Sequence, residues 1–139
     1  MAVINSGIGS TFLKFTFTDN DGDVVASFRM NPADVKLAQR CQEVSGYFEN
    51  LRDNTPETAT LEDALKMNAE MESKICYLLG YDATETLFGQ ISATSVMSDG
   101  NMFIVHVMSK IVDAVGPEIR KRKQSMEKAV AKHTAKYQK

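Results

Sequence analysis

The chain has 139 residues, the size of one ordinary domain, and 43% of them are hydrophobic and 24% charged. These proportions match globular averages and exclude wholesale disorder. No apolar run is long enough for a membrane span, and the N-terminus lacks the basic start and apolar stretch of a secretion signal.

The charge is distributed unevenly, although the net charge is only −2. Residues 120–139 hold eight Lys and Arg against one acid, which gives +7, whereas residues 1–119 hold eight against seventeen acids, which gives −9. The body is therefore acidic and the tail basic. We expect a flexible arm at 1–11, a single globular domain at 12–116, and a basic C-terminal helix at 117–139.

Two strands joined by an acidic turn are the first elements that the sequence predicts. Leu13, Phe15 and Phe17 alternate with polar residues, and a second strand-forming run covers 24–29. Because an isolated hairpin is marginal in water, its Phe face should pack on helices. The turn at 19–23 lacks the glycine and the glutamate that a calcium loop requires, so we interpret it as a hairpin turn.

Two amphipathic helices are predicted next. The first should begin at Asn31 as N-cap, with Pro32 as its first helical residue, and end near Asp53. The second should begin at Thr60, which forms a capping box with Asp63. Their apolar stripes predict two buried faces: Leu37, Cys41, Val44, Phe48 and Leu51 in the first, and Leu61, Leu65, Asn68, Met71 or Glu72, Ile75 and Leu78 in the second.

Residues 78–89 mark the end of the second helix and the start of a short one. Gly80 suits the left-handed residue that commonly ends a helix. Asp82 is predicted to be the N-cap of the short helix, with Glu85 completing something close to a capping box, and Gly89 to close it. We expect the other segments to bury their apolar faces around this stretch.

A long apolar helix is predicted from about Asp99 to Val115, and it should be central to the domain. Gly116 and Pro117 should break it or kink it sharply. A separate helix should then project from the body. Lysines at every fourth position make one face of it a cationic ridge, which follows a basic cluster: Lys128, Lys132 and Lys136 after Arg120, Lys121, Arg122 and Lys123.

Together these elements predict an α+β fold, mainly α, in which an N-terminal β-hairpin packs on a bundle of about four helices with a basic C-terminal helix. No catalytic constellation is recognisable. His106 and His133 lie in different predicted segments, and the zinc, phosphate-loop and serine-nucleophile spacings are missing. We therefore expect no enzyme, no cofactor and no metal site.

The segment from Leu79 to Gly89 resembles the small tail-assembly chaperone-like proteins of phages and prophages in Gram-positive bacteria. Leu79-Gly80 and Phe88-Gly89 stand where that family carries two Phe-Gly pairs, and Thr84 matches its threonine. Asp82 replaces the family's second glycine, and Leu79 replaces its first Phe. The resemblance covers about a dozen residues and is diffuse elsewhere.

The resemblance implies a non-enzymatic factor in the bacterial cytoplasm. Such a factor binds the tape-measure protein and tail-tube protein during tail assembly and is absent from the finished particle. The candidate partner-binding residues are Tyr81, Leu87 and Phe88 in the resembling segment, with Arg120, Lys121, Arg122, Lys123, Lys128, Lys132 and Lys136 in the tail.

Other readings of the sequence stay open. The basic helix could serve a small nucleic-acid-associated protein, although only Tyr137 is aromatic there, which disfavours nucleic acid. The chain could also be a structural virion or head–tail connector subunit. The basic ridge by itself is compatible with a solvated face, with contact to its own acidic body, or with self-association.

Overall fold

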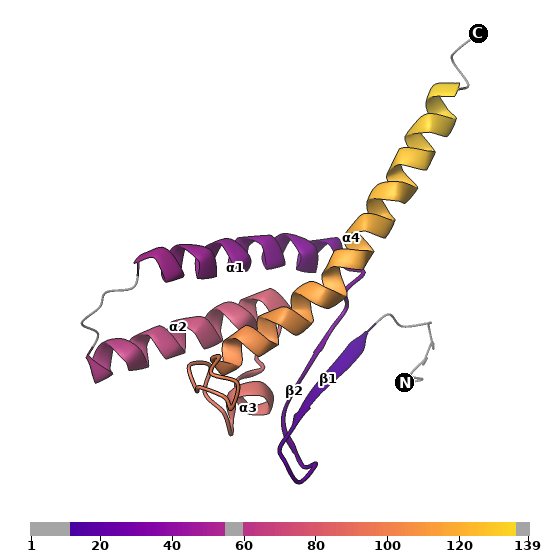
Figure 1. The fold of residues 1–139 in the computed structure, drawn as a ribbon. Coiled ribbons are helices and arrows are strands. Elements are labelled where there is room, and N and C mark those ends of the chain that lie inside the picture. Colours follow the sequence, from indigo (N-terminus) through magenta and orange to yellow (C-terminus); the bar gives the residue numbers. More distant parts are fainter. Residues whose placement is uncertain (1–11, 55–59, 136–139) are drawn as a thin grey trace, which may run out of the picture.

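The structure, a computed structural model, describes residues 12–54 and 60–135 (Figure 1). Within these ranges a two-stranded antiparallel sheet precedes four helices, which confirms the predicted α+β, mainly α fold. The arm predicted at 1–11 lies outside the described residues. In the same ranges, no helix is long and apolar enough to cross a membrane.

Strands β1 (Leu13–Thr18) and β2 (Val24–Met30) form the predicted hairpin. The acidic turn between them folds onto itself: one carboxylate oxygen of Asp19 accepts the backbone N–H groups of Asp21 at 2.9 Å and Asp23 at 3.0 Å. Gly22 supplies the positive φ of 84° that this turn needs.

The Phe face of the hairpin packs on the helices, as predicted. Phe15 stacks on the buried Phe28 with ring centres 4.9 Å apart, and Phe17 meets Phe103 of the last helix edge-on at 5.1 Å. Aromatic contacts of this geometry add to the burial of the rings. The hairpin is thereby part of the core.

Helix α1 (Val35–Asn54) starts later than predicted. The Asn31 side chain accepts the N–H of Ala33 at 3.2 Å, and its carbonyl accepts the N–H of Asp34 at 3.1 Å, so these residues form a turn. Asp34 then accepts the N–H of Lys36 at 3.0 Å, next to the first helical residue. The prediction of Asn31 as N-cap was wrong, because its side chain is used within the turn.

Helix α2 (Leu61–Leu79) has the predicted Thr60–Asp63 capping box. It ends as predicted at Gly80, which has a φ of 81° and donates its N–H to the Cys76 carbonyl at 2.9 Å. The predicted burial of Leu61 and Leu65 was wrong, because Leu61 is 77% exposed and Leu65 63% exposed. Only the second half of α2 is buried, through Met71, Ile75, Leu78 and Leu79.

Helix α3 (Thr84–Phe88) is the predicted short helix, but its N-cap is Ala83 and no side chain caps it. Asp82 lies one residue too early: it accepts the hydroxyl of Thr84 at 2.6 Å and the N–H of Thr84 at 3.1 Å. These two bonds hold the pKa of Asp82 below its usual value. Gly89 follows the helix with a right-handed backbone. A Cβ there would lie 2.3 Å from the Glu85 carbonyl oxygen, so close packing requires this glycine.

Helix α4 (Phe103–Ala135) starts later than the predicted Asp99 and runs through Pro117. A turn precedes it, in which the N–H of Met97 donates to the Asn101 carbonyl at 2.8 Å and Gly100 has a φ of 87°. Of the two predicted alternatives at Gly116 and Pro117, the break was wrong, and with it a separate helix from 117, because α4 is continuous there. Gly116 lacks the Cβ that would crowd the proline ring, so the helical backbone is tolerated there. Figure 1 shows the axis of α4 changing direction near its middle.

One core joins all of these elements. Helices α1 and α2 lie side by side and run in opposite directions, and α4 crosses beside them (Figure 1). The largest fully buried side chains are all apolar and come from β2 and all four helices: Phe28, Met30, Val44, Ile75, Leu78, Leu87, Phe103, Val107, Ile111 and Val115. The second half of α4 extends beyond this core, as expected for the tail.

Candidate interaction groove

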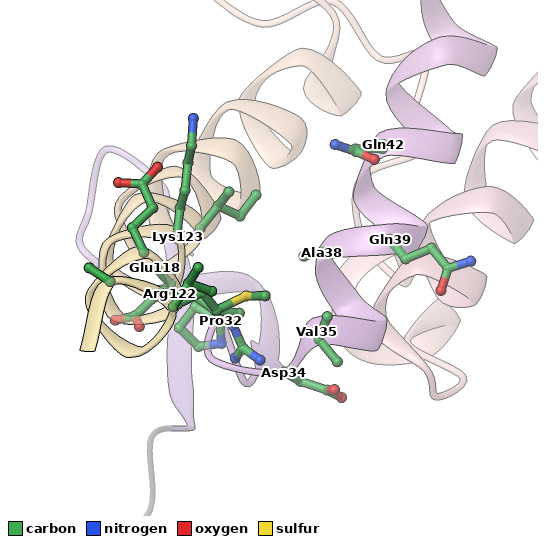
Figure 2. A pocket seen from close by; sticks show the side chains of 14 residues that line it. Pro32, Asp34, Val35, Ala38, Gln39, Gln42, Glu118, Arg122 and Lys123 are labelled. Atoms are coloured by element: carbon green, nitrogen blue, oxygen red, sulfur yellow. The ribbon is translucent and has the colours of Figure 1, made fainter. Parts of the chain in front are cut away.

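A groove with a volume of about 770 Å³ lies between the start of α1 and the second half of α4. The turn before α1 lies between the two walls, with Pro32 and Asp34 (Figure 2). Arg122 of α4 donates a hydrogen bond to the Ala33 carbonyl of this turn. This contact connects α4 to the turn before α1.

The α4 wall presents an apolar stripe to the groove. Ile119, Met126 and Val130 are separated by seven and four residues, so they share one face of the helix. Met126 is 62% exposed and Val130 63% exposed. On the α1 wall, the exposed Val35 and the small side chain of Ala38 line the opposite side. Apolar surface is therefore open to solvent along both walls.

Charged groups of both signs line the groove alongside this apolar surface. Arg122 and Lys123 provide positive charge, while Asp34, Glu118 and Glu127 provide negative charge. A surface of mixed sign suits a partner that itself carries both charges. It suits a uniformly negative polymer less well, because three carboxylates would face it.

The structure separates the predicted partner-binding residues into three groups: those that support the fold, basic residues that line the groove, and basic residues outside it. Leu87 and Phe88 are buried in the core, so they are not accessible to a partner in this fold. Tyr81 is partly buried and its hydroxyl accepts the backbone N–H of Arg29 at 2.8 Å, which fastens β2 to the junction of α2 and α3. These three residues of the resembling segment therefore support the fold.

The basic residues form the other two groups. Arg122 and Lys123 line the groove, whereas the exposed Arg120, Lys121 and Lys128 do not. Lys121 and Lys128 are seven residues apart and share a face of α4 outside the groove. The Lys132 side chain and all of Lys136 lie outside what the structure describes, so the full cationic ridge stays a prediction.

Sequence reasoning missed the groove itself. Val35 and Ala38 fall outside the α1 core stripe, and Ile119, Met126 and Val130 are among the few apolar residues of a charged tail. The only available signal was the seven- and four-residue spacing from Ile119 to Val130. The groove forms because α4 continues past Pro117 across from the start of α1, whereas the sequence predicted a break or a sharp kink at that point.

Two features of the described residues bear on metal sites and on the histidines singled out in the sequence. Between 12–54 and 60–135, no three His, Cys, Asp or Glu side chains are placed to hold a metal ion. His106, in the first turn of α4, lies 3.0 Å from the exposed Asp99 in the turn before the helix and is itself only partly buried. Neither a protein-family model, nor a curated protein, nor a solved structure matches this chain.

Proposed function

We propose that the protein is a non-enzymatic, tail-assembly chaperone-like factor that binds an amphipathic helix of its client in the groove between α1 and α4. The observation that carries the proposal is the exposed apolar stripe of Ile119, Met126 and Val130 opposite Val35. Two helical walls with apolar residues at helical spacing are the setting in which a third helix packs.

The chemistry of the groove fits a client that must be released later. Met126 is a flexible, polarisable side chain that adapts to different apolar partners. The groove is open at the surface and carries charges of both signs, so occupation covers apolar area without a deeply buried ion pair. These properties support reversible covering of an aggregation-prone helix.

The family resemblance implies that the clients are the tape-measure protein, a long helical chain, and the tail-tube protein. It also implies that binding takes place in the bacterial cytoplasm. A tape-measure helix has long apolar faces that associate unless they are covered. The resemblance is an association by sequence, so the groove and the client need a direct test.

The test is a pull-down with matched variants from bacteria that express the phage tail proteins, with nuclease treatment and mass spectrometry. Met126→Asp places a carboxylate in the groove, and Gln124→Asp places the same group on the same exposed turn outside it. We expect wild type and the Gln124 variant to recover a long helical tail protein, and the Met126 variant to lose it. Equal recovery by both variants, or recovery only of nucleic-acid-bridged proteins, would refute the proposal.

A second copy of this chain is the other occupant that the experiment must distinguish. Sedimentation of the purified wild type and the Met126 variant across a range of concentrations provides that control. A wild-type dimer that the Met126 substitution dissociates would assign the groove to self-association instead of a client.

A further inference from the structure

A second pocket, of about 610 Å³, lies where β2, the start of α1 and the end of α2 meet. Two arginines from different elements line it: Arg29 of β2 and Arg40 of α1. Asn31 and Asp34 come from the turn between these elements, and Tyr81 from the loop after α2. The groove described above uses neither arginine.

Arg40 is held in place by the end of α2. Its Nε donates to the Leu78 carbonyl at 2.9 Å, one of the last carbonyls of the helix that have no partner within it. Its Nη2 lies over Gly80, where an added Cβ would come within 3.3 Å. Within the described part of the chain, the Nη groups of Arg40 donate no hydrogen bond.

Arg29 is held against Tyr81, the residue that follows Gly80. The carbon of its guanidinium lies 5.2 Å from the centre of the Tyr81 ring, and the Tyr81 hydroxyl accepts the Arg29 backbone N–H. This arrangement fixes the strand through the main chain and places the guanidinium on the ring face. Two guanidinium groups thus lie against the consecutive residues Gly80 and Tyr81.

The charge of the pocket is positive. Two arginines and one carboxylate line it, and that carboxylate, of Asp34, already accepts the N–H of Lys36. The nearby Glu43 carboxylate does not line the pocket and accepts the Tyr77 hydroxyl at 2.6 Å. The N-terminus of α1 adds positive partial charge beside it. Guanidinium groups with free, planar donors are the side chains best suited to hold carboxylate or phosphate oxygens.

We propose that this pocket binds one oxyanion group, a carboxylate or a phosphate, between Arg29 and Arg40. The site shares Asp34 with the client groove, but neither of its arginines lines that groove, so the Arg29 and Arg40 variants test it independently of the proposed chaperone function. The ligand could be an acidic group of a partner or a free anion, and the two chemistries are distinguished by the probes.

The test is an NMR titration of the full-length protein with inorganic phosphate and, separately, with acetate, at an ionic strength held constant with sodium chloride. We expect saturable shifts of the Gly80 and Tyr81 amide signals and of the Arg40 Nε–H signal. The anion that saturates at the lower concentration, phosphate or acetate, identifies the preferred chemistry.

Three variants sharpen the titration. Arg29→Gln removes a guanidinium but keeps the backbone bond to Tyr81, and we expect about tenfold weaker binding from the loss of charge-assisted hydrogen bonds. Asp34→Asn keeps a helix-capping side chain but removes the opposing charge, so binding should tighten several-fold. Arg120→Gln makes the same charge change on α4 outside the pocket and should leave binding unchanged.

Shifts that rise linearly without saturation would overturn the proposal. So would equal affinities of wild type, the Arg29 variant and the Arg120 variant, because they would show a general charge effect. If Arg29→Gln loses its dispersed spectrum, Arg40→Lys provides the second measurement: it keeps the charge and removes the planar fork, and unchanged binding there would also contradict the site.

Discussion

The two halves of α4 belong to one continuous helix but have opposite surroundings. In the first half, Phe103, Val107, Ile111 and Val115 are buried among the strands and the other helices. In the second half, Met126 and Val130 are largely exposed beside the groove. The difference shows that a helix can be stabilised at one end by packing while its other end leaves apolar residues open to solvent.

The largest expected effect tests this contrast directly. Phe103→Ala removes a buried ring that contacts Phe17 and Phe88, and we expect it to lower the free energy of unfolding by about 3–5 kcal/mol. Met126→Ala in the exposed half should change it by less than about 0.5 kcal/mol. Urea denaturation followed by circular dichroism measures both values. Similar losses in the two variants would mean that the second half is also covered.

The junction of the two halves gives the next largest effect. Pro117→Ala restores an N–H for the Asp113 carbonyl in the helix interior, so we expect the free energy of unfolding to rise by about 1–3 kcal/mol. The same denaturation experiment measures it. A decrease would instead show that the change of direction in α4 is needed to bring Arg122 to the Ala33 carbonyl.

A truncation should have a smaller effect on stability. Removing residues 124–139 retains Arg122 and its bond to the turn, and it deletes only the outer part of α4. We expect the free energy of unfolding to change by less than about 1 kcal/mol, because the deleted apolar side chains contribute little to the core. A loss of several kcal/mol that depends on protein concentration would point to a second copy covering this half.

The smallest expected effect concerns acid stability at the start of α4. The backbone N–H of Asn101, and then the His106 ring, hold the pKa of Asp99 below 3.8. Because the unfolded chain binds this proton more readily, the contribution to stability is present above pH 3.8 and is lost as pH falls through the lower folded value.

When the pH is lowered from about 5 to about 3, the free energy of unfolding of the Asp99→Asn variant should therefore fall less than that of wild type. Denaturation midpoints at the two pH values test this expectation. Asp113→Asn, which removes an exposed acid further along α4, provides the matched control. Equal losses in wild type and the Asp99 variant would show that this carboxylate does not contribute.

Local sequence patterns were sufficient for most of the fold. The alternation of Phe15 and Phe17, the capping box of Thr60 and the left-handed Gly80 each depend on a few neighbouring residues, and all were predicted correctly. Helix starts were less predictable, because Asn31 and Asp82 could cap several positions and the tertiary structure selects among them.

The candidate groove depended on information that local patterns do not contain. Pro117 was expected to break α4 or kink it sharply, and only a continuous α4 places Met126 and Val130 across the groove from the start of α1. The same limit applies to Leu87 and Phe88: an apolar pair at the end of a short helix has the same sequence whether it faces a partner or the core.

The continuity of α4 also makes the second half of that helix a lever arm. Residues 118–135 span about 27 Å at the helical rise per residue, and they meet the body near Pro117 and Arg122. A rotation of a few degrees about this point moves the outer end of α4 several times farther than the part of the helix next to the body. A small rotation there would change the width of the groove at its outer end, whereas Phe103 and its neighbours would stay in place because they are buried in the core.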